Sequence, residues 1–180
     1  MATADGQMSM SEDRVGRYRL TRQIHGRGAF GEVHVVVGPA QAGDESRVIW
    51  AVAEGERSIR LDADPLDASA ALDGALQGLV LAESLGAPVA EQVVRVTRVG
   101  IILADTEPSA VRAAATAAVV RAFGLEDKCQ LIYEDGWRYE EKPPGQPHGS
   151  GQRSCLGPTM TAAAVDRTTG LVIPGSGWLP

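Results

Sequence analysis

A short segment near the N-terminus combines arginines, glycines and one aromatic residue, which are residue types that bind phosphate groups and unpaired bases. Between residues 14 and 31 the chain carries five arginines and no acidic residue, so this segment holds a charge of about +5 in a chain of net charge −6. A guanidinium group offers paired donors to phosphate and stacks on bases. The segment predicts local, salt-dependent contact with a polyanion such as RNA. The arginines are Arg14, Arg17, Arg19, Arg22 and Arg27.

Glycines punctuate the second half of this segment, from His25 to Gly31. A glycine loop lets backbone N–H groups approach a phosphate closely, and Phe30 offers a ring for stacking on an unpaired base. The alternative interpretation is structural only. In it the glycines turn the chain between two strands, Phe30 belongs to the core, and the arginines at 17, 19 and 22 line one solvated strand face.

The glycine spacing also matches the phosphate loop of protein kinases, G-x-G-x-x-G-x-V, from Gly26 to Val33. Kinase chemistry further needs a lysine on the next strand, a catalytic Asp with Asn, and a metal-binding Asp, and the sequence lacks these. No helix is expected directly after the glycines, which argues against a dinucleotide-binding loop. We therefore expect no nucleotide cofactor and no kinase activity.

His25 and Asp105 are the best candidates for catalysis, because a His–Asp pair can act as a base and its orienting group. No nucleophile motif, metal-ligand spacing or cofactor fingerprint accompanies them. Cys129 and Cys155 form neither a metal motif nor a disulfide framework. The basic neighbour Arg153 would lower the pKa of the Cys155 thiol, although an ordinary tail cysteine is the simpler interpretation.

The length of 180 residues suits one domain with an appended tail. Residues 1–13 are polar and predict a flexible arm without the apolar region of a secretory signal. No apolar run reaches the roughly 18 residues of a membrane span, so we expect no membrane association and a cytoplasmic location. We expect a domain over residues 14–125 and a β-rich extension over residues 126–180.

Hydrophobic periodicity predicts the elements that position these residues. A helix from 65 to 85 carries leucines at three- and four-residue spacings, and Gly74 and Gly78 are expected to let it pack closely on a sheet. A second helix follows an N-cap at Asp105 or Thr106 and ends at Gly124. Strands are expected at 18–24, 33–37, 47–53 and 89–102, with hairpins at 129–133/137–141 and at 161–173. Strands and helices are mixed without strict alternation, which predicts an α+β fold with a mostly antiparallel sheet.

The order of several motifs resembles domain IV of elongation factor G. The stretch Arg22-Gln23-x-x-Gly26-Arg27-Gly28-x-Phe30-Gly31-x-Val33, with Pro39 further on, is similar to the start of that domain. The helix at 71–85 with its Pro88 turn, the loop at 100–110 and the alanine-rich helix at 113–123 follow in the family's order. The resemblance covers roughly residues 15–125. It implies a ribosomal protein S5 domain 2-like fold with two helices on one face of the sheet, followed by a C-terminal β-hairpin extension.

In that family this loop lies at the tip of the domain and meets RNA of the small ribosomal subunit. The resemblance implies a noncatalytic accessory protein that binds the small subunit or structured RNA, with antibiotic self-protection as a candidate role. Three departures stand out: residues 101–106 lack the family's histidine, His25 stands where the family has a glycine, and the chain has no GTPase motif. The implied contact residues are Arg19, Arg22, Gln23, His25, Gly26, Arg27, Gly28, Phe30, Asp105 and Thr106.

Two other functions remain open at this point. The fold could serve as a small enzyme or pathway accessory in specialised metabolism, since the resemblance places His25 and Asp105 near each other at one end of the sheet. It could equally be a structural domain that binds protein through its tail. Trp137, Tyr139 and Trp178 are large late residues that suit an interface, and a homodimer through the C-terminal extension is slightly favoured.

Overall fold

The computed structural model describes residues 13–24, 26–53, 58–102 and 105–144 of the chain. Most of the expected N-terminal arm lies outside these residues, as do His25, the second expected hairpin at 161–173, and both Cys155 and Trp178. No helix within the described ranges is both long enough and apolar enough to cross a bilayer.

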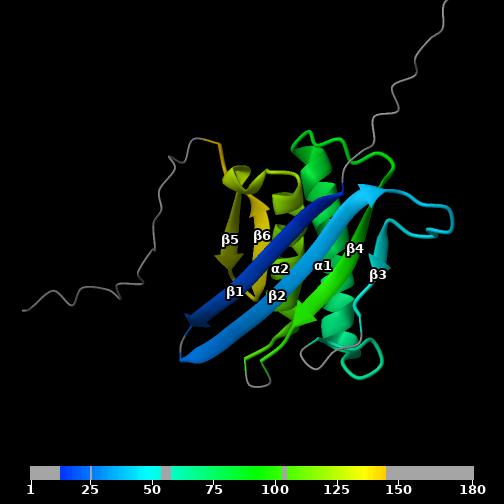
Figure 1. The fold of residues 1–180 in the computed structure, drawn as a ribbon. Coiled ribbons are helices and arrows are strands. Elements are labelled where there is room, and N and C mark those ends of the chain that lie inside the picture. The colour runs from blue at the N-terminus through cyan, green and yellow to red at the C-terminus, as the bar shows by residue number, and fades with distance from the viewer. Residues whose placement is uncertain (1–12, 25, 54–57, 103–104, 145–180) are drawn as a thin grey trace, which may run out of the picture. The chain divides into compact units, whose positions relative to one another are not determined.

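Four strands form the main sheet, in the order β1-β2-β4-β3 (Figure 1). They are β1 (Arg14–Ile24), β2 (Arg27–Pro39), β3 (Val48–Trp50) and β4 (Gln92–Gly100). The β1–β2 and β2–β4 pairs are antiparallel, and the short β3 runs parallel to β4. Helices α1 (Pro65–Ser84) and α2 (Pro108–Ala122) cover one face of this sheet, behind it in the view of Figure 1. The predicted α+β fold, a mostly antiparallel sheet with two helices on one face, is confirmed.

The core forms where alternate strand residues meet the helices. Val33, Val35 and Val37 of β2 are fully buried, as are the neighbouring valines of β4. Strand side chains alternate between faces, so the residues between these valines point to the other side of the sheet. That face carries polar and charged residues, among them Glu32, His34 and Arg98.

Most of the expected glycine loop belongs to a strand. Strand β2 begins at Arg27, and Gly26 occupies the turn with a φ of +78°. A Cβ atom on Gly31 would lie 2.6 Å from the carbonyl oxygen of Ala110, and one on Gly28 would overlap the Asp105 carboxylate. The glycines therefore let the start of α2 and its preceding loop approach the sheet. The expectation of a loop is therefore wrong for residues 27–31, which belong to β2.

Helix α1 buries a different face from the one that its leucines suggest. Leu66 is 75% exposed, and Leu76 and Val80 are also exposed. The buried face consists mainly of alanines together with Gly74, Gly78 and Leu79. A Cβ atom on Gly78 would lie 2.7 Å from Cβ of Val119, so both glycines admit helix α2. The expectation that they pack against the sheet is wrong, because periodicity identifies a face but not the neighbour that covers it.

The sequence predicts the C-terminal end of helix α2 correctly but not its N-cap. Glu107 holds the N-cap position and makes no side-chain cap hydrogen bond, so the prediction of Asp105 or Thr106 is wrong. The hydroxyl of Thr106 instead accepts a hydrogen bond from the backbone N–H of Ile102 at 2.8 Å. The predicted end at Gly124 is confirmed, and its φ of +69° is a conformation that favours glycine.

A short 3-10 helix (Glu126–Lys128) leads to the hairpin of β5 (Cys129–Tyr133) and β6 (Trp137–Glu141), which confirms the predicted hairpin. Trp137 is 6% exposed and packs in a small cluster with Leu20 and Ala29 of the sheet and Ala110 and Ala113 of α2. The hairpin therefore shares a core with the main sheet and α2.

Candidate functional site

The open face of the main sheet carries a group of charged residues in two adjacent rows. The strand register places Arg17, His34 and Arg98 side by side across β1, β2 and β4. The neighbouring row contains Arg19, Glu32 and Gly100. Because directly opposite residues have Cβ atoms roughly 5 Å apart, these side chains form one surface. We call Arg17, Arg19, Glu32, His34 and Arg98 the sheet-face cluster.

Glu32 is the only acidic member of this cluster, and two arginines and one histidine approach its carboxylate. Its Oε2 lies 3.8 Å from Nε of Arg19, and its Oε1 lies 3.8 Å from Nε of Arg98. Nε2 of His34 is 3.2 Å from the same Oε1. Burial lowers the pKa of His34; the nearby Arg17 and Arg98 lower it further, whereas Glu32 raises it. With His34 neutral, three arginines and one carboxylate leave a charge of about +2.

The five arginines of the basic segment do not share one face. Arg17 and Arg19 lie on the open face, whereas Arg22 occupies a register position on the side of Leu20 and Ile24. The expectation that residues 17, 19 and 22 line one strand face is wrong, because 22 differs from the other two by an odd number of residues. Arg14 lies near the other end of β1, with its guanidinium 5.3 Å from the centre of the Phe123 ring.

The end of the β1–β2 hairpin carries the exposed remainder of the basic segment. Figure 1 shows this end reaching past the helices. Arg22, Gln23 and Arg27 are exposed there, beside the turn at Gly26. No carboxylate among the described residues lies within ion-pairing distance of Arg22 or Arg27. The hairpin end is thus a cationic projection, as far as the structure describes it.

Phe30 is 4% exposed, and the Arg19 guanidinium covers its ring at 5.3 Å from the ring centre. Its backbone N–H donates a hydrogen bond to the carbonyl oxygen of Asp105 at 2.8 Å. Phe30 also forms an isolated bridge with Thr106. The structural interpretation of Phe30 is therefore correct, and the expected stacking of its ring on a base is not available in this arrangement.

Asp105 lies against strand β2 at Gly28, as the close approach to that glycine shows. Gly28 pairs with Gln23 in the β1–β2 register, so Asp105 lies beside the hairpin end. The structure thus brings Asp105 and Thr106 to the basic segment. The proposed His25–Asp105 pair cannot be placed, since His25 is outside the described residues.

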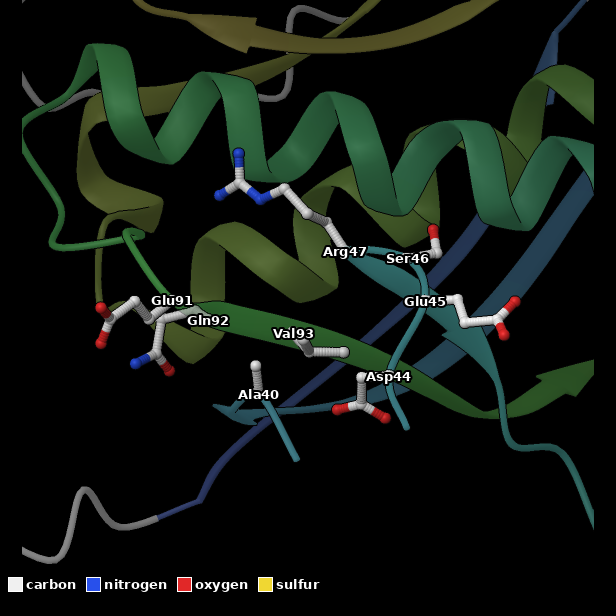
Figure 2. Close-up of a pocket in the computed structure, with 8 residues that line it drawn as sticks. All are labelled: Ala40, Asp44, Glu45, Ser46, Arg47, Glu91, Gln92 and Val93. Atoms are coloured by element: carbon white, nitrogen blue, oxygen red, sulfur yellow. The ribbon is translucent and has the colours of Figure 1, made fainter. Parts of the chain in front are cut away.

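A depression of about 250 Å³ lies between the loop at 40–47 and the start of β4 (Figure 2). Its carboxylates at Asp44, Glu45 and Glu91 point in different directions in Figure 2. Asp44 is paired with Arg95 at 2.7 Å, and Arg47 donates a hydrogen bond to the carbonyl oxygen of Val89 at 3.0 Å. This arrangement has no group of side chains converging on a substrate. A second depression of similar volume lies around Trp50 and Arg60, and neither contains Asp105.

No group of three or more His, Cys, Asp and Glu side chains in the described part of the chain is arranged to hold a metal ion. Cys129 is buried in β5, and this burial, together with the charge of Glu141, raises the pKa of its thiol to about 11. A thiol with such a pKa is ionised to about one part in a thousand at pH 8 and is a poor nucleophile.

We therefore expect Cys129 to resist alkylation in the folded protein. In a Cys155→Ser variant, iodoacetamide at pH 8 should leave Cys129 unmodified over a time that fully alkylates the same protein in urea. Mass spectrometry of the intact chain measures the result. Equal alkylation rates in folded and unfolded protein would show that Cys129 is accessible and ionisable, contrary to its burial.

Sequence reasoning missed part of the open face. It singled out Arg19 but left out His34 and Arg98 as site residues. A usable signal was present, because the charged residues of β2 and β4 occur between buried valines. The contribution of Arg98 also depends on an irregularity, since the β2–β4 register shifts between His34 and Val35 and aligns Arg98 with His34. Such a shift has no simple sequence signature.

No protein-family model matches the chain, and no curated protein sequence matches it. Among solved structures, a crystal structure of a protein from Thermus thermophilus is similar, with 23% sequence identity and a TM-score of 0.44. The similarity covers 62% of this chain and 16% of the other. The chain therefore matches only a small part of that longer protein.

Proposed function

We propose that this protein binds RNA without catalysis, through the end of its β1–β2 hairpin. The observation that carries the proposal is the exposure of Arg22 and Arg27, with no carboxylate of the described residues within ion-pairing distance. An unpaired, exposed guanidinium keeps its donors available for a phosphate. Gln23 and Arg19 add further donors on the open face of the same hairpin.

The charge distribution restricts where RNA can bind. The chain has a net charge of −6, so most of its surface repels a polyanion. Favourable contact is then local to the basic hairpin, and the affinity should fall steeply with salt as counterions are released. The pairing of β1 with β2 over eleven residues holds the arginines on a defined scaffold, which limits the entropy lost on binding.

The resemblance of residues 15–125 to elongation factor G domain IV favours a specific setting for this activity. We propose an accessory protein of the cytoplasm that binds the small ribosomal subunit or another structured RNA, with antibiotic self-protection as its candidate role. A homodimer through residues 126–180 stays a prediction, and sedimentation analysis of the full chain tests it.

We expect charge reversal at the hairpin end to weaken RNA binding. Fluorescence anisotropy with a labelled ribosomal RNA hairpin, and co-sedimentation with small subunits, would compare the parent with Arg22→Glu/Arg27→Glu. We expect at least a tenfold loss of affinity at low salt, and a salt slope smaller by about 1.4 to 1.8 if two phosphate contacts are lost.

The matched control is Arg60→Glu/Lys128→Glu, which makes the same change in net charge at two other exposed positions, one before α1 and one after the C-terminal end of α2. This variant should lose less than threefold in affinity. Failure of the parent to bind either RNA or small subunits, or equal losses in the two double variants, would overturn the proposal.

A further inference from the structure

We propose that the sheet-face cluster is a second phosphate-binding surface for the same RNA, in which the Glu32 carboxylate occupies the place of a phosphate. This inference rests on the proposed function and extends its contact surface from the hairpin end across β1, β2 and β4. Glu32 then acts as an internal competitor that limits the affinity of the face for RNA.

The first support is convergence. Arg19, His34 and Arg98 come from three different strands, and all three reach the carboxylate of Glu32 within 4 Å. Arg17 lies beside His34 in the same row. Like charges so close together are unfavourable unless an anion lies among them. The strands therefore hold a preformed site for a negatively charged group, and the protein supplies one such group itself.

The second support is the unused hydrogen-bonding capacity of the arginines. The two Arg–Glu32 contacts, both through Nε, are 3.8 Å long, which exceeds a hydrogen bond. The side chains of Arg17, Arg19 and Arg98 donate no hydrogen bond to another described residue. Each guanidinium has five N–H donors in a planar fork that fits a phosphate. A phosphate at this face would satisfy donors that Glu32 leaves free.

The third support concerns what the face can recognise. The aromatic ring within it, Phe30, is buried beneath Arg19. The described part of this face exposes no phenylalanine, tyrosine or tryptophan ring for stacking on unpaired bases, whereas it exposes several guanidinium donors. Phosphate groups along an RNA backbone are therefore the matching ligand. Arg19 and Gln23 lie on the open face, whereas Arg22 occupies a register position on the other side of β1. An RNA strand that bends around the hairpin end would therefore contact both surfaces.

The test compares Glu32→Gln with the parent for binding of the labelled RNA hairpin. The variant keeps the size of the side chain and removes its charge, so we expect roughly three- to tenfold tighter binding at low salt. The control is Glu126→Gln, which removes one exposed carboxylate away from the sheet and should change the affinity less than twofold. Equal affinities of Glu32→Gln and Glu126→Gln would overturn the inference.

A second variant tests the inference even if Glu32→Gln fails to fold. We expect Arg17→Gln/Arg98→Gln to reduce the salt slope by about 1.4 to 1.8, and to do so additively with the hairpin-end variant. An unchanged slope, beside a clear loss in Arg22→Glu/Arg27→Glu, would overturn the cluster and leave the proposed function standing. Equal competition by polyglutamate and by RNA at the same charge concentration would also overturn the inference, in favour of an acidic protein partner.

Discussion

Replacing Gly74 with alanine is expected to destabilise the protein, although alanine is the better helix former. Helix propensity alone favours the substitution by about 1 kcal/mol. Packing against α2 disfavours the substitution, because the new Cβ atom would overlap the backbone carbonyl of Arg112 and lie 2.9 Å from Cβ of Ala115. Neither obstacle can rotate away. Helices α1 and α2 would have to separate along a tightly packed interface of small residues.

We expect the free energy of unfolding to fall by about 2 kcal/mol, as is typical of an overpacked interior. The hydroxyl of Thr116, a buried residue, donates a hydrogen bond to the carbonyl oxygen of Gly74 at 3.0 Å, and separation of the helices would weaken this bond as well. Urea denaturation followed by circular dichroism measures the change. The control is Gln77→Ala on the exposed side of α1, which should change stability by less than about 0.5 kcal/mol. Stabilisation by Gly74→Ala would show that the helices are not in close contact here.

Truncation of Trp137 to alanine is expected to have the largest effect on stability of the substitutions considered. Its side chain is buried between the main sheet and α2, where it contacts a cluster that includes Leu20 and Ala113. Removing an indole ring from such a position leaves a large cavity, and similar substitutions cost about 3 to 5 kcal/mol. We expect a loss of this size in urea denaturation monitored by circular dichroism.

The control for this substitution is Tyr133→Ala on the same hairpin. The Tyr133 ring contacts Trp137 edge to face at 5.1 Å between ring centres, but Tyr133 is 46% exposed. Its loss should cost only about 1 kcal/mol. If Trp137→Ala cost no more than Tyr133→Ala, the hairpin would not be part of the core, and its residues would be better regarded as a separate attachment.

Hydrophobic periodicity predicted most helices and strands, but it did not predict which element packs against each of their faces. The alternating valines of β2 predict a buried strand face, and the signal at Gly124 predicts the end of α2 correctly. The leucines of α1 mislead, because the helix needs small residues where it meets α2 and leaves Leu66 exposed. A helical pattern shows that a face is continuous, but the partner that covers it is a tertiary property.

The sequence predicted which residue types form the candidate site, but it predicted their positions less well. The excess of arginine in residues 14–31 points to a basic surface, and the resemblance to a translation-factor domain points to its hairpin end. The glycines in that segment suggest an open loop, whereas the structure uses Gly31 to admit the Ala110 backbone. The place of Arg98 beside His34 depends on a register shift between strands, which one sequence does not reveal.

The position of β1 at the margin of the main sheet has a consequence for solubility. Among the described residues, no strand pairs with the outer edge of β1, and an exposed strand edge of eleven residues is a template for aggregation between copies. If two copies joined there in antiparallel fashion, guanidinium groups at 17 and 19 would face their counterparts at close range and repel them. The arginines that we propose for RNA contact would therefore also act as gatekeepers against self-assembly, and exchanging them for neutral residues carries the added risk of precipitation.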